Sequence, residues 1–190
     1  MFNSKKPGAA KSAATLENLQ AALSGEMNAK ARYQQFAAKA DEEGYGAVAS
    51  LFRAAALAEG IHAGNHGKVI VKLGDAPLVK FEIPDVKSTR ENLEAAIRGE
   101  IYERDEMYPA FIEQARADSQ AAAEHTFALA MAVEAEHARL YTAALNNLEQ
   151  MRGGARTYYV CPVCGFTAEQ PEFELCPVCS TPVEQFQKES

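Results

Sequence analysis

Residues 17–26 read ENLQAALSGE and return as residues 91–100, ENLEAAIRGE, with seven of ten positions identical at an offset of 74 residues. Two further segments match in outline at an offset of 75, namely SLFRAAALAEGIH ending at His62 and HTFALAMAVEAEH ending at His137. Apolar residues and alanines recur in all four at three- and four-residue spacing, the period of an amphipathic helix. The chain therefore carries an internal duplication of a helix pair.

This duplication predicts an all-α fold. Gly44 and Gly46 mark a tight turn within the first pair, whereas residues 74–87 contain two prolines and no helical period, which indicates an extended crossover. Ser88 or Thr89 is a suitable N-cap for the third helix. Two helix pairs joined by one long crossover form an up-and-down four-helix bundle. The expected helices are residues 15–42, 45–73, 90–117 and 119–150.

Composition divides the chain into one average domain and one small one. The first residues are small and polar, and Gly153 and Gly154 end the last helix. All four cysteines lie beyond these glycines, between residues 161 and 179. We expect a loose tail over residues 1–14, a bundle over 15–151, a linker over 152–157 and a cysteine domain over 158–190.

Charge and hydropathy exclude two classes of partner. The longest apolar run, residues 127–133, is far shorter than the ~18 residues that a membrane span requires. A net charge of −7 argues against nucleic acid, because nucleic-acid binders usually carry a basic face. No apolar stretch follows the first lysines, and the cysteines form a compact cluster, so we expect a cytoplasmic protein with reduced thiols.

Acidic residues and histidines occupy equivalent places in the two halves. Each second helix carries Glu-x-x-His, which sets both side chains on one helical face, and each first helix carries one glutamate among apolar neighbours. Four buried carboxylates need cations to compensate them, and two divalent ions balance their charge. Oxygen-rich ligation suits iron or manganese. The set matches that of ferritin-like di-iron proteins and comprises Glu26, Glu59, His62, Glu100, Glu134 and His137.

Three further residues are candidates at this site. Glu103 follows Glu100 by one helical turn and is either a solvated glutamate or a seventh ligand that breaks the symmetry. Tyr33 and Tyr108 lie two turns along from Glu26 and Glu100, and they either donate hydrogen bonds to ligand carboxylates or only pack in the core. His66 and His125 lack such partners in the sequence and are expected to be ordinary polar residues.

The cysteines form two CPVC knuckles separated by eleven residues. Each CxxC pair wraps one side of a tetrahedral metal, and about 30 residues provide too little core to fold without one. Spacing alone does not separate a zinc ribbon from a mononuclear iron centre, since both are tetrahedral sulfur sites. The candidate ligands are Cys161, Cys164, Cys176 and Cys179.

Together these motifs resemble the rubrerythrin family from about residue 15 to the end. The resemblance rests on Gly25-Glu26, EGIH at 59–62, GEIYE at 99–103, EAEH at 134–137 and the two knuckles. It implies a ferritin-like bundle with two non-haem iron ions, and a rubredoxin-like domain with one iron on the four cysteines. It also implies seven di-iron ligands, the six above and Glu103, with His62 and Glu103 exchanging at one iron.

The function expected from this resemblance is a peroxidase that reduces hydrogen peroxide to water in oxidative-stress defence. Electrons would arrive from a donor protein, a rubredoxin or an NAD(P)H-dependent reductase, through the sulfur-ligated iron. The alternatives are iron oxidation and storage in a ferritin-like protein, or an interaction module with zinc at the cysteines. The last helix ends roughly 25 Å beyond Glu134, and a linker of ~18 Å makes return to the same bundle look strained. We therefore expect a head-to-tail homodimer in which electrons cross between subunits.

Overall fold

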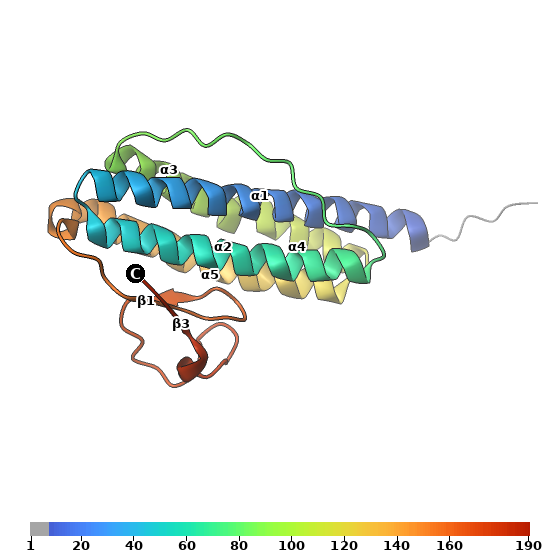
Figure 1. The fold of residues 1–190 in the computed structure, drawn as a ribbon. Coiled ribbons are helices and arrows are strands. Elements are labelled where there is room, and N and C mark those ends of the chain that lie inside the picture. Colours follow the sequence, from blue (N-terminus) through green and yellow to red (C-terminus); the bar gives the residue numbers. More distant parts are fainter. Residues whose placement is uncertain (1–7) are drawn as a thin grey trace, which may run out of the picture.

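A computed structural model of the chain describes residues 8–190, with side chains from residue 13 onward. Its helices form an antiparallel bundle with one small β-containing module against its side (Figure 1). This confirms the expected fold class. The α-helices are α1 Gly8–Glu42, α2 Gly46–Lys72, α3 Thr89–Tyr102, α4 Tyr108–Ala117 and α5 Ala121–Asn146. No helix within residues 8–190 combines the length and the apolarity that crossing a bilayer requires.

Helix α1 begins earlier than expected, so the prediction of a loose tail to residue 14 is wrong for residues 8–14. The segment AAKSAA is rich in strong helix formers, which favours continuing the helix towards the N-terminus. Thr15 also anchors this part of the helix, because its Oγ1 donates a 2.7 Å hydrogen bond to Asp118 Oδ2. Residues 1–7 lie outside the described residues.

The third helix of the bundle is interrupted by a π-helix, Glu103–Met107, between α3 and α4. The repeat explains its position. Glu26 and Glu100 correspond at an offset of 74, whereas Tyr33 and Tyr108 correspond at 75, so one extra residue lies between Glu100 and Tyr108. A π-helix widens one turn and absorbs a single inserted residue without ending the helix. The continuous helix predicted over residues 90–117 is corrected accordingly, and the one predicted over 119–150 ends in a 3₁₀ turn, Leu148–Met151.

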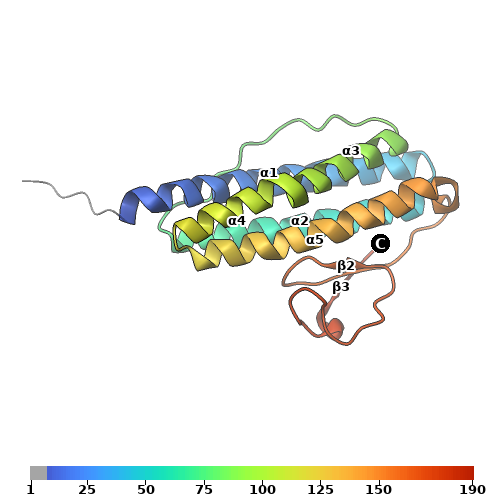
Figure 2. The same cartoon turned by 180° about the vertical axis from the view of Figure 1, so that it is seen from behind.

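Connections between the helices follow the local sequence. Gly44 takes a φ of +79° in the turn between α1 and α2. Ser88 is the N-cap of α3, and its hydroxyl accepts from the Glu91 amide while the Glu91 carboxylate accepts from the Ser88 amide. This reciprocal pair fixes where the crossover ends. The crossover itself, residues 75–87, runs in extended form along the outside of α1 (Figure 2).

Two apolar clusters fill the bundle. One contains stacked and edge-on aromatic rings, including Tyr33, Phe36 and Phe52. The other surrounds Ile70 and Phe127. Buried carboxylates lie between the two clusters, so they are surrounded by apolar side chains along the bundle axis.

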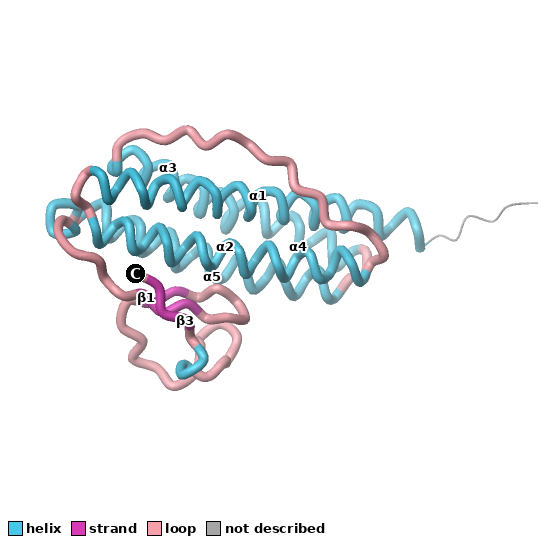
Figure 3. Tube along the Cα trace, viewed as in Figure 1, coloured by secondary structure: helices cyan, strands magenta, loops and turns pink. Residues whose placement is uncertain are grey.

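The C-terminal module is a three-stranded antiparallel sheet with long loops, packed against α2 and α5 (Figure 3). Its linker passes close to the α1–α2 turn, where the Gly153 amide donates to the Gly44 carbonyl oxygen across 3.1 Å. A Cβ atom at Gly46 would overlap the Gly153 carbonyl oxygen, so this close crossing requires glycine. The strands are β1 Tyr158–Val160, β2 Thr167–Ala168 and β3 Gln187–Glu189, in the order β2-β1-β3.

Candidate metal centres

Four helices bring six of the expected ligand residues to one point inside the bundle. Their ligand atoms form two overlapping groups in which all atoms lie within 4.8 Å of one another. Glu59 of α2 and Glu134 of α5 belong to both groups. One group adds Glu26 and His62, and the other adds the equivalent pair Glu100 and His137. The arrangement has the pseudo-twofold symmetry of the duplication, with two shared carboxylates in the middle.

Both histidine rings direct Nδ1 towards the carboxylates. Nδ1 of His62 lies 3.0 Å from Glu59 Oε2 and 3.0 Å from Glu134 Oε1. Nδ1 of His137 lies 3.0 Å from Glu134 Oε2 and 3.5 Å from Glu59 Oε1. Each ring therefore offers one nitrogen to the space between the shared glutamates, and its Nε2 faces outward.

The donor atoms of this cluster suit metal ions. The unpartnered buried polar side-chain atoms of the described residues are concentrated here and include both oxygens of Glu59 and Glu134 and Nδ1 of both histidines. Such atoms are costly to bury unless something binds them. Four carboxylates balance two divalent cations, and oxygen with imidazole nitrogen suits iron. The cluster therefore fits a di-iron site.

Two tyrosines hold outer carboxylates in a crossed pattern. The Tyr33 hydroxyl, on α1, donates to Glu100 Oε1 on α3. The Tyr108 hydroxyl, at the start of α4, donates to Glu26 Oε1 on α1. Each half of the duplication thus supplies a tyrosine to the glutamate of the other half. Such hydrogen bonds orient a ligand carboxylate and leave its second oxygen for the metal.

His66 belongs to the same network, although we expected an ordinary polar residue. It is fully buried, with Nε2 3.1 Å from the Tyr108 hydroxyl and Nδ1 3.1 Å from Thr126 Oγ1. The sequence contained a signal, since His66 lies one turn beyond His62 on the same face. His125, in contrast, is exposed.

Glu103 lies outside both groups of ligand atoms. It begins the π-helix and is partly buried. Loss of hydration, followed by repulsion from Glu26 and Glu100, raises the pKa of its carboxyl group well above the ordinary value. The negative charge of the cluster therefore repels the Glu103 carboxylate, although this carboxylate lies outside both groups of ligand atoms. Of the two residues expected to exchange at one iron, His62 is the one that lies among the ligand atoms.

Burial and mutual repulsion alter the ionisation of the cluster when no cation compensates it. Loss of hydration, and then the charges of Glu134 and Glu26, raises the pKa of Glu59 to about 7. Burial likewise raises the pKa of Glu100 well above its usual range. Burial also opposes ionisation of Glu134, but attraction to His62 leaves its pKa below the ordinary value. The fully ionised cluster is thus a state that bound cations would stabilise.

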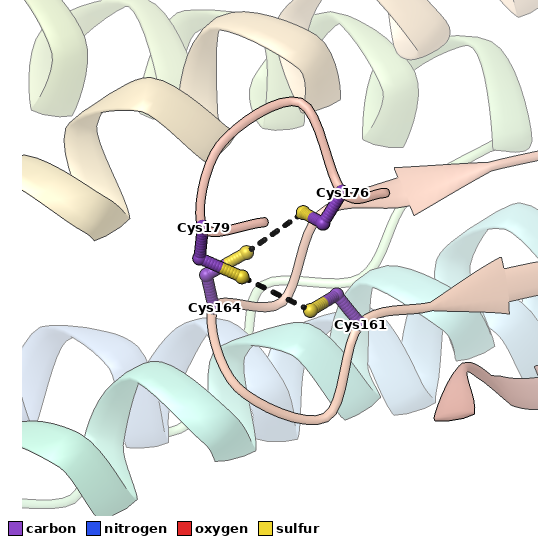
Figure 4. A group of neighbouring side chains, drawn as sticks. All are labelled: Cys161, Cys164, Cys176 and Cys179. Atoms are coloured by element: carbon purple, nitrogen blue, oxygen red, sulfur yellow. Dashed lines mark hydrogen bonds between the residues drawn. The ribbon is translucent and has the colours of Figure 1, made fainter. Parts of the chain in front are cut away.

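The four cysteines form a second candidate centre in the module (Figure 4). The Sγ atoms of Cys161 and Cys179 lie 3.5 Å apart, as do those of Cys164 and Cys176. These separations suit a tetrahedral ion with metal–sulfur distances of ~2.3 Å. None of the four forms a disulfide. The Thr181 hydroxyl lies 3.1 Å from Cys179 Sγ and can donate to a thiolate there.

The two knuckles have the same backbone form. The Gly165 amide donates to the Cys161 carbonyl oxygen, and the Ser180 amide donates to that of Cys176, each across 2.9 Å. Gly165 and Ser180 both take a positive φ, +83° and +61°. Each turn directs its two cysteine sulfurs towards one point. This geometry and the thiolate ligands suit iron.

The module docks directly over the histidines of its own bundle. Nε2 of His62 donates to the carbonyl oxygen of Cys164 across 2.9 Å. Nε2 of His137 lies 3.4 Å from Thr167 Oγ1, which itself donates to a carbonyl oxygen. The Asn65 amide adds a 2.8 Å bond to Val163 O. These bonds hold both rings with Nδ1 free for a metal.

The return of the chain to its own bundle, which the sequence suggests is strained, is therefore possible without strain. The linker is not the only part of the chain that covers this distance, because β1 and the first knuckle also run back along α2. Twelve residues separate Arg152 from Cys164, and an extended chain of that length spans ~40 Å. The ~25 Å along α5 is within that reach. The module needs no partner subunit to reach a di-iron site.

The sequence of the chain is similar to those of known proteins. Residues 17–145 match the family model for rubrerythrin. Nigerythrin of Nitratidesulfovibrio vulgaris is 37% identical over 175 residues, which cover 90% of this chain and 85% of that protein. Rubrerythrin-2 of Clostridium acetobutylicum is 35% identical over 179 residues, which cover 93% of this chain and 97% of that protein.

Solved structures show the same likeness. Nigerythrin in its fully reduced, all-ferrous state superposes with a TM-score of 0.85 at 38% identity, covering 92% of this chain and 86% of that one. The bacterioferritin of Desulfovibrio desulfuricans gives a TM-score of 0.73 at 20% identity, covering 80% of this chain and 94% of that one. The second likeness shows the shared bundle fold.

Proposed function

Because this chain belongs to the rubrerythrin family of di-iron oxidoreductases, we propose that it is a peroxidase that reduces hydrogen peroxide to water in defence against oxidative stress. One observation carries the proposal: the His62–Cys164 hydrogen bond joins the carboxylate cluster to the sulfur cluster within one chain. Reduction of one hydrogen peroxide to two waters consumes two electrons and two protons. A site for two metal ions can supply two electrons. A sulfur-ligated iron that carries one electron at a time can then reduce that site again.

In this proposal the six clustered residues hold the two irons. Glu59 and Glu134 would serve both ions, because each carboxylate belongs to both groups of ligand atoms. Glu26 with His62 would complete the ligands of one ion, and Glu100 with His137 would complete those of the other. Bound ferrous ions would each supply one electron to the O–O bond and stabilise the charge that develops on oxygen.

The surrounding residues prepare the cluster for this chemistry. The module and the two apolar clusters exclude bulk water from it, which strengthens every electrostatic interaction inside. Tyr33 and Tyr108 keep their hydroxyl protons and donate them as hydrogen bonds to the outer carboxylates. The reason is that burial raises the pKa of both phenols well above the ordinary value. The exchange of His62 for Glu103 at one iron, implied by the family resemblance, stays a prediction.

The electron donor would be a rubredoxin or an NAD(P)H-dependent reductase that meets the module. Val163 and Leu175 flank the cysteines and expose 45% and 53% of their surface. Exposed apolar side chains beside a redox centre suit a transient protein contact. Cysteines reserved for a metal fit the reducing cytoplasm, where we propose that the protein works. The head-to-tail homodimer stays a prediction, and the contact within one chain offers electrons a route that does not cross between subunits.

The test separates the two centres. Protein reduced without oxygen and mixed with limiting hydrogen peroxide should consume one peroxide for every two electrons withdrawn. Glu134→Ala should lose this reaction and iron in the bundle, because it removes a shared ligand, whereas His125→Ala, at an exposed histidine, should keep both. Equal behaviour of the two variants would remove the di-iron assignment.

Cys161→Ser tests the second centre. Thiolate-bound ferric iron absorbs in the visible range, so the oxidised protein should be red and this variant should lose that colour. Its bundle should still react once with peroxide, but sustained turnover from an electron donor should stop. A colourless parent protein with zinc at the cysteines would favour an interaction module instead. A large closed shell that accumulates iron would favour storage.

A further inference from the structure

A chain of hydrogen bonds leads from α5 to the carboxylate cluster and takes one residue from each of four helices. Thr126 Oγ1 of α5 lies 3.1 Å from Nδ1 of His66 in α2, and Nε2 of the same ring lies 3.1 Å from the Tyr108 hydroxyl of α4. Tyr108 donates in turn to Glu26 of α1. All four side chains are buried, and Phe127 packs against the His66 ring. The imidazole is therefore held between one hydroxyl and the next.

The protons of this chain point towards Glu26. The Tyr108 hydroxyl has one proton and gives it to Glu26 Oε1, so towards His66 its oxygen can only accept. Nε2 of His66 must then carry a proton, and Nδ1 of a neutral ring accepts from Thr126. Glu26 Oε2 has no hydrogen-bond partner among the described residues. The chain thus engages one oxygen of Glu26 and leaves the other for a metal ion.

His66 fixes the direction of the Tyr108 proton. A hydroxyl proton rotates to suit its neighbours, so an apolar residue at position 66 would leave it free to point away from Glu26. Donation from Nε2 occupies the other side of the hydroxyl oxygen and keeps the proton on the Glu26 side. Hydrogen bonds in a row also polarise and strengthen one another. His66 therefore supports the Glu26 carboxylate although it is not itself among the ligand atoms.

The other half of the duplication lacks this chain. At the offset of 75, the residues equivalent to His66 and Thr126 are Tyr141 and Leu51. Leu51 has no polar side-chain atom, and the buried Tyr141 hydroxyl has no hydrogen-bond partner within residues 8–190. The duplication therefore repeats the ligands but not the residues behind them.

The second tyrosine has a different neighbour. Tyr33, which supports Glu100, has the guanidinium of Arg32 beside it, with the guanidinium carbon 5.6 Å from the ring centroid. This guanidinium belongs to a half-buried residue, whereas the His66 ring is fully buried and held at both nitrogens. The supports of the two outer carboxylates are thus of different kinds.

We propose that His66 is a positioning residue for only one of the two metal ions, the one that Glu26 and His62 would hold. It acts through the Tyr108 hydroxyl, because its own Nε2 lies 3.8 Å from Glu26 Oε1, beyond hydrogen-bond distance. Loss of His66 should weaken this ion and leave the other unchanged. The inference rests on the ligand set of the proposed function and not on peroxide turnover.

The first experiment measures the affinity of the full chain for ferrous iron without oxygen, by competition with a ferrous chelator. His66→Leu should release one of the two bundle ions at a chelator concentration roughly two- to twelvefold lower, the factor of one hydrogen bond, and the second ion at the parent concentration. His66→Gln keeps a side-chain N–H and should stay close to the parent. Equal release in parent and His66→Leu, equal weakening of both ions, or equal losses in the two variants would overturn the proposal.

Glu134→Ala separates this failure from that of the ligand set. Loss of a shared carboxylate should release both bundle ions. If this variant retains both ions as tightly as the parent, the ligand set is wrong and the role of His66 fails with it. If it releases them and His66→Leu behaves like the parent, the ligand set stands and only the role of His66 fails.

A double-mutant cycle tests whether His66 acts through Tyr108. Tyr108→Phe removes the hydroxyl that receives the hydrogen bond, so His66→Leu in this background should cost no further affinity. A merely structural role would give the same loss in both backgrounds. That result would overturn the proposed route.

The direction of the chain is tested on the zinc-loaded protein, because zinc is diamagnetic. Nitrogen-15 NMR distinguishes the two imidazole tautomers, and His66 should carry its proton on Nε2. Thr126→Val removes the donor to Nδ1, so the same ion should bind more weakly, though by less than in His66→Leu. Thr142→Val is the matched control on the same helix, since Thr142 donates only to Ala138 O. A parent proton on Nδ1 alone, or equal affinities in the two threonine variants, would overturn the proposal.

Discussion

His62 donates from Nε2 to the carbonyl oxygen of Cys164 across 2.9 Å, while its Nδ1 lies 3.0 Å from two carboxylates of the buried cluster. One imidazole ring therefore links two candidate iron centres directly, although Cys164 lies 102 residues beyond His62 in the sequence. The contact fixes the orientation and the tautomer of the ring, and we expect it to carry electrons between the two centres.

Gly165→Ala should weaken this link. An added Cβ would lie 2.7 Å from His62 Nε2 and 3.2 Å from Ala58 Cβ, at a φ of +83° that non-glycine residues avoid. The module must shift, and misplacement by ~1 Å can slow a reaction by up to about 100-fold. Stopped-flow absorbance of the sulfur-bound iron, after mixing reduced protein with peroxide, measures the transfer. Gly154→Ala, with open space around it, should keep the parent rate. Equal rates in both variants would show that this contact does not carry the electrons.

Tyr108→Phe should lower iron affinity in the bundle. The change removes the hydroxyl that donates to Glu26, and loss of such a support typically costs about 10- to 100-fold in metal affinity or activity. Tyr33→Phe should act similarly through Glu100. Competition with a ferrous chelator measures the affinity. Tyr102→Phe is the control, because Tyr102 exposes 52% of its surface. If all three variants release iron alike, the crossed tyrosines only pack.

Glu103→Ala should keep the reduced di-iron site and slow its reoxidation by peroxide. The reason is that Glu103 lies outside the clustered ligand atoms and would act only when the iron charge rises. Glu106→Ala removes an exposed acid of the same π-helix and is the matched control. Rapid mixing with peroxide gives the rate, and metal analysis gives the iron content. Parent-like reoxidation in Glu103→Ala would return this residue to the role of a solvated glutamate.

The metal-free protein should lose stability as the pH rises from mildly acidic to mildly basic. Glu59 has an ordinary pKa of 4.5 in the unfolded chain and a raised pKa of about 7 in the fold. The folded state therefore holds this proton more tightly, so its stabilising effect is full below pH 4.5 and is lost as the pH rises through 7. The contribution is on the order of 3 kcal/mol. Urea unfolding at several pH values should show it as a difference from Glu59→Gln. A difference that is constant with pH would contradict the raised pKa.

Mixed dimers of Glu134→Ala and Cys161→Ser should not regain donor-linked turnover. Each chain's module contacts its own bundle through His62 and Asn65, so the intact module serves the bundle that has lost its shared ligand. Purification with two different affinity tags isolates the mixed dimers for the assay. Recovery of activity would instead show that the module reaches the bundle of the partner subunit.

The bundle and its six clustered residues were predictable because the duplication placed them in register. Glu59 with His62 and Glu134 with His137 are informative only as a repeated pair, since a single Glu-x-x-His is common on helix surfaces. Ser88 was predictable as a cap because its chemistry is local. The roles of these residues as iron ligands stay a prediction.

Features that depend on contacts between distant segments could not be predicted from the sequence. His66 was overlooked because its partners, Tyr108 and Thr126, lie on other helices. The π-helix has no local signature, although the change of offset from 74 to 75 locates it once the tyrosines are aligned. Docking of the module was misjudged because it depends on the path of β1 and on apolar contacts such as those of Val133 with the cysteines.

The crossed tyrosines have a consequence for the origin of the site. Because Tyr33 of the first half supports Glu100 of the second, and Tyr108 supports Glu26, neither helix pair contains a complete centre. Two separate helix pairs would build it only on meeting, so its occupancy would depend on their concentration. Joining them through residues 75–87 makes that meeting intramolecular, with an effective concentration set by the tether. Gene fusion would thus have made formation of the centre independent of protein concentration. Only after the fusion could one extra residue make the two halves of the centre unequal.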